Sequence, residues 1–178
     1  MTRIIFCGWN GRMGKNIAEL VEADPDAQIV AGIDLVEGKA DFPTYTWDDK
    51  LSEEADVIID FSSPKALKDV LPLALERKIP VVFCTTGYSE EQIAEIKEAS
   101  KQIAILKSGN MSLGINTMMK LVKAAAEILA NNGFDIEIVE KHHNQKLDAP
   151  SGTALMLADA ANSGGGNKCE YESDYIFT

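Results

Sequence analysis

The sequence is poor in basic residues, and only three of them are arginine. Its 17 Lys and Arg residues stand against 28 Asp and Glu, which gives a formal net charge of −11 at pH 7. Nucleic acids and anionic membranes both require a basic face on their protein partner. The charge balance therefore argues against both as partners, although a local pocket on an acidic protein can still bind a small anion.

Long apolar stretches and cysteines are also scarce. No stretch approaches the roughly 20 apolar residues of a membrane span. The start, MTRIIFC, leads into a strand-like segment without the features of a secretory signal. Cys7, Cys84 and Cys169 are odd in number and lack the spacing of a metal site, so we expect reduced thiols and no metal. A cytoplasmic protein is the resulting expectation.

What the 178 residues do contain is an ordinary globular composition, 46% hydrophobic and 25% charged. Over the first 110 residues, apolar runs alternate with segments of helical spacing. The runs at 3–7, 28–34, 56–61, 80–84 and 103–107 predict strands, and the segments 14–23, 64–78 and from Ser89 onward predict helices. Ser89 and Gln92 have the spacing of a capping box. This alternation is typical of βαβ units, so the sequence predicts an α/β fold with a doubly wound, parallel Rossmann-type sheet.

The pattern changes after about residue 110. Residues 116–132 predict a long helix, the alternation in 135–143 predicts a strand of a second sheet, and 151–162 predict a further helix after a loop at 144–150. The final residues open with a glycine run and contain at most one strand, around 174–178. We therefore expect a dinucleotide-binding domain over 1–112 and a second, smaller α+β substrate domain over 113–178.

The glycines of Gly8–Gly14 (GWNGRMG) lie between the first predicted strand and the first predicted helix. Their spacing is a variant of the dinucleotide fingerprint, in which the backbone turns tightly and approaches a pyrophosphate at a helix N-terminus. Asp34 ends the second predicted strand, twenty residues after Gly14, where an acid binds the adenosine ribose hydroxyls. The alternative is that Asp34 is only a solvated acid in a turn.

Two further loops of small polar residues follow predicted strands, Cys84–Gly87 (CTTG) and Ser108–Met111 (SGNM). Ligands of doubly wound sheets bind beyond the carboxyl ends of the strands. Both loops are therefore expected on the face where a nicotinamide would rest, although Thr-Thr-Gly alone is also an ordinary turn.

The strongest single feature is the segment His142–Thr153 (HHNQKLDAPSGT), which holds the only two histidines and Lys146. An imidazole and an ammonium can supply a proton and positive charge near neutral pH. Ser-Gly-Thr at the start of a helix offers N–H groups and hydroxyls to a carboxylate. Two histidines without a third ligand do not close a metal site. The alternative is a solvated polar loop.

The string EKHHNQKLDAPSGTA resembles the signature of the 4-hydroxy-tetrahydrodipicolinate reductase family, pyridine-nucleotide enzymes of bacterial and plant lysine and diaminopimelate synthesis. Other motifs agree in order, namely GWNGRMG, DFSSP at Asp60–Pro64, TTG at Thr85–Gly87 and SGNMSLGIN at Ser108–Asn116. The resemblance covers about residues 2–162. It implies an oxidoreductase that uses NADH or NADPH to reduce a small cyclic dicarboxylate.

The resemblance also implies roles for individual positions. His142 matches the family's proton donor, and Lys146 a second proton donor beside the substrate. The implied substrate-binding residues are His143, Gly152 and Thr153. The implied cofactor-binding residues are Gly8, Trp9, Asn10, Gly11, Arg12, Met13, Asp34, Cys84, Thr85, Thr86, Ser108, Gly109, Asn110 and Met111.

Two departures from the family pattern stand out. Cys84 replaces an expected glycine, where contact through the backbone would leave little affected. After Asn162 the chain lacks the further strands and the glycine-rich substrate motif that the resemblance implies, and much of the interface of the family's homotetramer. Three hypotheses follow: an active reductase, a module that binds NAD(P) without catalysis because its second domain is incomplete, or a different dehydrogenase of the same two-domain plan. The HHNQKLDAPSGT string argues against the third.

Overall fold

The structure, a computed structural model, describes residues 1–36, 38–142 and 150–166. The chain divides into two compact units, Met1–Gly109 and Asn110–Thr178. Within the described residues, no helix has both the length and the apolar character that crossing a membrane requires.

The first unit is built on a six-stranded parallel sheet in the order β3-β2-β1-β4-β5-β6. Its strands are β1 (Thr2–Cys7), β2 (Ala27–Ile33), β3 (Thr44–Tyr45), β4 (Val57–Asp60), β5 (Val81–Phe83) and β6 (Ile105–Lys107). The chain moves outward from β1 in one direction and then returns to β4, on the other side of β1, which defines a doubly wound sheet. The predicted fold class is confirmed.

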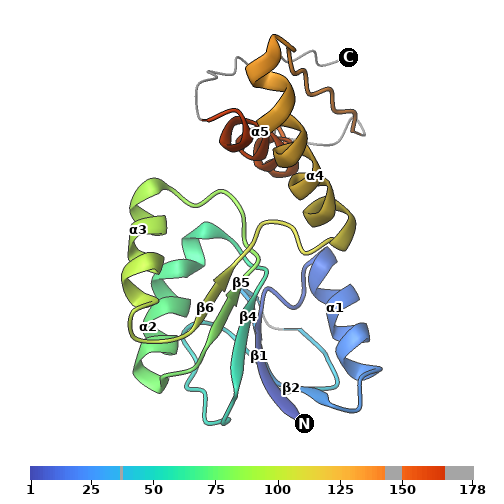
Figure 1. The fold of residues 1–178 in the computed structure, drawn as a ribbon. Helices are drawn as coiled ribbons and strands as arrows, with labels where there is room; N and C mark the ends of the chain where they lie inside the picture. The colour runs from blue at the N-terminus through green and yellow to red at the C-terminus, as the bar shows by residue number, and fades with distance from the viewer. Residues whose placement is uncertain (37, 143–149, 167–178) are drawn as a thin grey trace. The chain divides into compact units, whose positions relative to one another are not determined.

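Helices cover both faces of this sheet, α1 on one and α2 and α3 on the other (Figure 1). They are α1 (Arg12–Glu22), a short 3-10 helix η1 (Pro64–Ala66), α2 (Leu67–Arg77) and α3 (Glu90–Ala99). Successive residues of a strand face opposite sides, so β1 serves two cores. Ile4 and Phe6 pack with residues of α1, whereas Ile5 and Cys7 pack with residues of α2 and α3.

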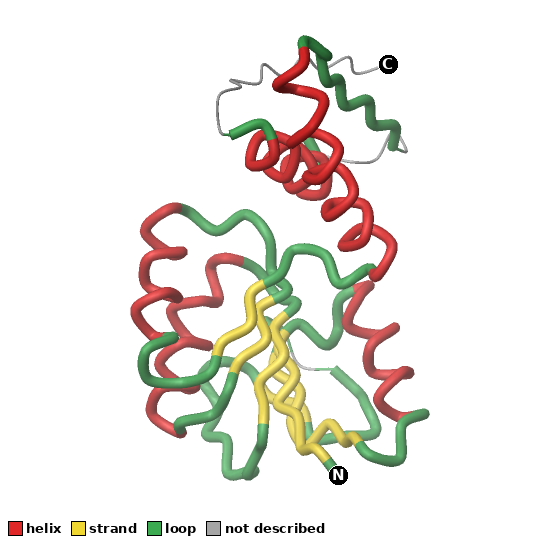
Figure 2. Tube along the Cα trace, in the orientation of Figure 1, coloured by secondary structure: helices red, strands yellow, loops and turns green. Residues whose placement is uncertain are grey.

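Local signals place the helix ends of this unit. The predicted capping box at α3 is confirmed, because Ser89 and Gln92 each accept a hydrogen bond from the other's backbone N–H. The sequence pattern missed β3, whose two residues are too few to show an alternation. Thr44 and Tyr45 pair with Gly32 and Ile33 at the edge of the layer of strands that Figure 2 shows in yellow.

The second unit contains α4 (Leu113–Leu129), a short 3-10 helix η2 (Ala130–Asn132) and α5 (Gly152–Gly164). Both long helices were predicted, and Gly133, at φ 80°, follows the end of the first. The two helices approach closely through small residues. A Cβ atom on Gly164 would lie 2.2 Å from the carbonyl oxygen of Lys123, and Ala126 and Ala161 are buried.

The predicted strand at 135–143 is wrong over the residues that the structure describes. Residues 134–142 are irregular, and the alternating Ile136 and Ile138 remain 45% and 42% exposed. A strand needs the N–H and C=O groups of a neighbouring strand, and alternation alone does not supply them. The described residues of this unit include no such neighbour. The predicted strand near 174–178 and most of the 144–150 loop lie outside the described residues.

Candidate functional site

The loops singled out in the first 109 residues follow neighbouring strands at one edge of the sheet. Backbone hydrogen bonds connect them in sequence, from Gly8 N to Ile33 O, Phe61 N to Cys7 O, Cys84 N to Asp60 O and Ser108 N to Phe83 O, at 2.8–3.0 Å. Parallel strands bring their carboxyl ends to the same edge, where ligands of doubly wound sheets bind. The structure therefore brings together the strand ends that carry the predicted cofactor residues of this unit.

The glycine-rich loop between β1 and α1 depends on the absence of side chains. Gly8 has φ 80°, and a Cβ atom there would lie 2.7 Å from the carbonyl carbon of Phe61. A Cβ atom on Gly14 would lie 2.3 Å from the carbonyl oxygens of Gly8 and Trp9. Gly11 is different, because its Cβ would meet only the Gly8 oxygen, at 3.4 Å. The first and third glycines fold the loop, and the exposed middle one keeps its outer surface bare.

The N-terminus of α1 fits an anionic ligand. Gly11 is its N-cap and supplies no side-chain hydrogen bond, and no acidic residue lies in the first turn, which begins with the exposed Arg12 and Met13. By contrast, Ser89, Ser112 and Ser151 cap α3, α4 and α5 through their side chains. An uncapped helix start beside a bare glycine loop suits a pyrophosphate. The residues present therefore fit the dinucleotide that the sequence implies.

Asp34 lies directly after β2 and is tied to that loop. Its Oδ2 accepts a hydrogen bond from the backbone N–H of Asn10 at 3.0 Å, and its Oδ1 accepts one from Leu35 at 2.7 Å. The half-buried carboxylate is thus held in one orientation beside the first glycine. This arrangement does not support the alternative that Asp34 is only a solvated turn residue.

Trp9 belongs to the predicted cofactor residues, but its side chain is buried. The indole is 5% exposed and packs edge-to-face on Phe42, with ring centroids 5.5 Å apart. Gly32 and Gly38 leave the space that it fills, because a Cβ on either would lie 2.6–2.8 Å from the indole. Any contact of Trp9 with a ligand would therefore pass through its backbone.

The loop after β5 surrounds a buried carboxylate that sequence reasoning missed. Asp60, at the end of β4, is 1% exposed. Thr85, 6% exposed, donates its hydroxyl to Asp60 at 2.8 Å. Burial, with a contribution from the charge of Asp60, raises the pKa of Cys84 to about 11. Thr86 is exposed. The signal for Asp60 was available, since an acid ends an otherwise apolar buried run.

In the second unit, a predicted cofactor-binding residue contacts a predicted substrate-binding residue. The side-chain amide of Asn110, a predicted cofactor residue, donates to the hydroxyl of Thr153, a predicted substrate residue, at 3.0 Å. Asn110 also accepts from Ser112 N at 2.8 Å, at the start of α4. Exposed Met111 lies between them, and Gly109 ends the first unit.

Glu140 connects His142 to the start of α5. One carboxylate oxygen lies 2.7 Å from His142 Nε2, and the other accepts the backbone N–H of Ser151 at 2.8 Å. The hydrogen bonds from Ser151 and His142 lower the pKa of Glu140 to about 2. A carboxylate at a helix N-terminus is further favoured by the helix dipole. Sequence reasoning missed this role of Glu140, whose only signal was its position two residues before His142.

Ser151 caps α5 by accepting the N–H of Ala154 at 3.1 Å. Among the described residues, this leaves the backbone N–H groups of Gly152 and Thr153 at the helix start for a ligand. His143 and Lys146 lie outside the described residues. Their predicted roles therefore rest on the sequence.

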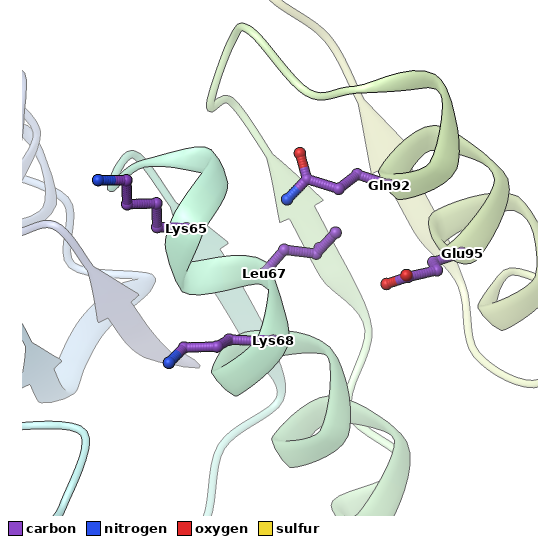
Figure 3. Close-up of a pocket in the computed structure, with 5 residues that line it drawn as sticks. All are labelled: Lys65, Leu67, Lys68, Gln92 and Glu95. Atoms are coloured by element: carbon purple, nitrogen blue, oxygen red, sulfur yellow. The ribbon is translucent and has the colours of Figure 1, made fainter.

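A shallow pocket of about 430 Å³ lies between α2 and α3 and contains none of the predicted site residues (Figure 3). Leu67 and Gln92 line it, and the Gln92 amide already donates to Pro64 O at 2.7 Å. The side-chain amide of Gln92 therefore serves helix packing. Among the described residues, no cluster of His, Cys, Asp and Glu could hold a metal ion.

Comparison with known proteins adds independent information. The chain matches two family models, "Dihydrodipicolinate reductase, N-terminus" over residues 2–111 and "Dihydrodipicolinate reductase, C-terminus" over residues 114–176. It is 54% identical over 171 residues to the 4-hydroxy-tetrahydrodipicolinate reductase of Caldanaerobacter subterraneus, and 47% identical over 172 residues to that of Clostridium tetani. Each alignment covers 96% of this chain and 67% of the relative, so the chain spans about two thirds of their length.

Among solved structures, the chain resembles a dipicolinate-bound dihydrodipicolinate reductase from Paenisporosarcina. The TM-score is 0.73 at 25% sequence identity, over 99% of this chain and 71% of that one. The family models cover both units. The chain belongs to the dihydrodipicolinate reductase family.

Proposed function

We propose that this chain reduces 4-hydroxy-tetrahydrodipicolinate to tetrahydrodipicolinate with NADH or NADPH, a step in the diaminopimelate route of lysine biosynthesis in which hydride and a proton are taken up and the 4-hydroxyl group leaves as water. The observation that carries the proposal lies at the carboxyl ends of the parallel strands. There the uncapped start of α1, the glycine-rich loop before it and Asp34 lie next to one another. The names of the similar proteins support the same chemistry.

The cofactor-binding residues in this proposal lie in the first unit, apart from Asn110 and Met111 at the start of the second. The backbone N–H groups of Arg12 and Met13 hold the pyrophosphate, and Asp34 accepts hydrogen bonds from the adenosine ribose. The segments at Cys84–Thr86 and Ser108–Met111 face the nicotinamide half. The reduced nicotinamide, when bound, supplies the hydride.

Residues of the second unit bind the dicarboxylate and handle protons. The N–H groups of Gly152 and Thr153 favour a carboxylate at the start of α5. His142 donates a proton, and its contact with Glu140 orients the imidazole. Lys146 adds positive charge and a second proton donor, and His143 binds substrate.

The alternative, a module that binds NAD(P) without catalysis, is not favoured. Both family models match, and the match to the C-terminal model includes His142 and Lys146.

The proposed activity implies the cytoplasm as its location, because it draws on the cell's own pool of reduced nicotinamide cofactor. A homotetramer stays a prediction, which size-exclusion chromatography with light scattering would test.

The activity is tested by mixing the chain with NADH and enzymatically prepared 4-hydroxy-tetrahydrodipicolinate. The proposal predicts substrate-dependent oxidation of NADH with formation of tetrahydrodipicolinate. Binding of NADH without any oxidation would favour the module instead. Absence of both binding and oxidation would contradict the proposed function altogether.

A further inference from the structure

Asp60 is a buried carboxylate with an unusual set of partners. Its Oδ1 accepts hydrogen bonds from the backbone N–H and the hydroxyl of Ser62, and its Oδ2 accepts the hydroxyls of Thr85 and Tyr88 at 2.8 and 3.1 Å. No ion pair within the described part of the chain involves Asp60. A buried carboxylate is costly unless hydrogen bonds replace its water. Its retention at 1% exposure therefore depends on these donors.

The two donors to Oδ2 stand at the two ends of one short loop. Thr85 and Tyr88 bracket Thr86 and Gly87, which are both exposed, and Gly87 has φ 81°. One carboxylate oxygen thus fixes both ends of the loop and leaves its middle accessible. Since the Thr85 hydroxyl is committed to Asp60, a ligand would meet the backbone of this loop and Thr86.

The surroundings of Tyr88 keep its hydroxyl as a hydrogen-bond donor to Asp60. Its ring packs edge-to-face on Phe83 with centroids 6.0 Å apart, and Lys107 Nζ lies 6.0 Å from the ring centroid. Burial, followed by the charge of Asp60, raises the pKa of Tyr88 well above its ordinary value. The hydroxyl therefore stays protonated at neutral pH and can donate to the carboxylate.

We infer that Asp60 is a positioning residue for cofactor binding, which holds the Thr85–Tyr88 loop in the conformation that receives the nicotinamide half of NADH. This inference rests on the proposed function, which places that loop beside the nicotinamide. Asp60 itself acts through Thr85 and Tyr88. The adenosine half is held separately, by the glycine loop and Asp34.

This separation provides the test, which compares the binding of NADH with that of ADP-ribose by isothermal titration calorimetry. Tyr88→Phe and Thr85→Val each remove one donor to Asp60 with little change in shape. Both are expected to weaken NADH binding about ten-fold, or about 1.4 kcal/mol, while ADP-ribose binding changes less than about two-fold. Thr85→Ser, which restores the hydroxyl, is expected to restore NADH binding.

A matched control is Tyr45→Phe. It removes another tyrosine hydroxyl that donates to a carboxylate, in this case from the last residue of the edge strand β3 to Glu53. It is expected to leave both affinities unchanged. NADH binding unchanged in Tyr88→Phe and Thr85→Val, or an equal loss of NADH and ADP-ribose, would overturn the inference. If the unmodified chain binds ADP-ribose but not NADH, or binds neither, the proposed function itself fails.

Discussion

The carboxylate of Asp34 and the backbone N–H of Asn10 form a 3.0 Å hydrogen bond that joins the end of β2 to the loop after β1. The acid that would bind the ribose and the loop that would bind the pyrophosphate are therefore fixed relative to each other. This contact is possible because β1 and β2 are neighbours in the parallel sheet. The ends of the two strands are also joined by the hydrogen bond from Gly8 N to Ile33 O at 2.8 Å.

The position of Asp34 predicts a preference between the two cofactors. We expect NADH to bind at least as tightly as NADPH, because the carboxylate would accept ribose hydroxyls and repel a 2′-phosphate. In Asp34→Ser, which keeps a short polar side chain, the ratio of the two dissociation constants should shift toward NADPH by about ten-fold, or about 1.4 kcal/mol. Calorimetric titration with each nucleotide measures this. Ten-fold tighter binding of NADPH by the unmodified chain would contradict the role of Asp34.

The glycine loop predicts opposite outcomes for two substitutions. Gly11→Val places a branched side chain where the pyrophosphate would lie, yet the nearest atom to its Cβ is 3.4 Å away. We expect this variant to lose at most about 1 kcal/mol of stability and to lose NADH binding. Gly14→Ala instead forces a Cβ to within 2.3 Å of two backbone oxygens, and should lose about 1–3 kcal/mol of unfolding free energy.

Urea unfolding and NADH titration of both variants separate these effects. A folded Gly11→Val protein with undiminished NADH affinity would show that the loop does not hold the phosphates. A Gly14→Ala protein as stable as the unmodified chain would show that α1 can move away from the loop.

The hydrogen bonds between Arg3 and Asp56 predict how the free energy of unfolding depends on pH. Three hydrogen bonds of 2.8–3.2 Å from Arg3 lower the pKa of Asp56 to about 2, below its ordinary value of 3.8. The folded state thus favours the ionised form, and this stabilisation is present above pH 3.8 and is lost as the pH falls toward 2. Asp56→Asn should lower the melting temperature at pH 6, and the difference should shrink between about pH 4 and 2. Asp41→Asn, at an exposed acid, controls for the change of charge.

Cys7 and Cys84 are expected to react slowly with thiol reagents. Cys7 is fully buried, and burial raises the pKa of Cys84 to about 11, so very little of either side chain is thiolate at neutral pH. We expect the rate of iodoacetamide labelling at Cys84, followed by peptide mass spectrometry, to keep rising past pH 9. The urea-unfolded chain serves as the control. A plateau at the ordinary thiol pKa near 9 would contradict the burial of the Cys84 thiol.

The first unit could be predicted from sequence because its signals are local. The run at 3–7, the glycines between it and the next helix, and the Ser89–Gln92 capping box each act over a few residues. The parallel, doubly wound sheet with helices on both faces followed from the alternation of strands and helices and from right-handed crossovers. The two-residue β3 carried no such signal, since its pairing with Gly32 and Ile33 depends on residues distant in the chain.

What the sequence did not predict depends on interactions that a linear pattern does not encode. Ile136 and Ile138 alternate as in a strand, but alternation does not provide a partner strand among the described residues. Two of the hydroxyls that donate to Asp60 come from residues 25 and 28 positions away. Trp9 is buried because Gly32 and Gly38 leave space for it. In each case the outcome depends on contacts between segments that are separate in sequence.

Lys146 is expected to act on both substrate binding and proton delivery. Its ammonium remains charged near neutral pH and would attract the dicarboxylate. Lys146→Ala should therefore raise the KM for the substrate and lower kcat, while the affinity for NADH stays unchanged. Steady-state kinetics with calorimetric titration of NADH separate these effects. An unchanged KM together with an unchanged kcat would leave Lys146 as a residue that only shapes its loop.

Single-turnover oxidation of bound NADH shows whether this chain reduces its substrate with protons supplied by His142. The unmodified chain and His142→Gln are each saturated with NADH and mixed with excess 4-hydroxy-tetrahydrodipicolinate, and the loss of reduced nicotinamide is followed by stopped flow. We expect rapid oxidation by the unmodified chain and oxidation about 10²–10⁴-fold slower in His142→Gln, with NADH affinity unchanged. Equal rates in the two proteins would contradict this role of His142.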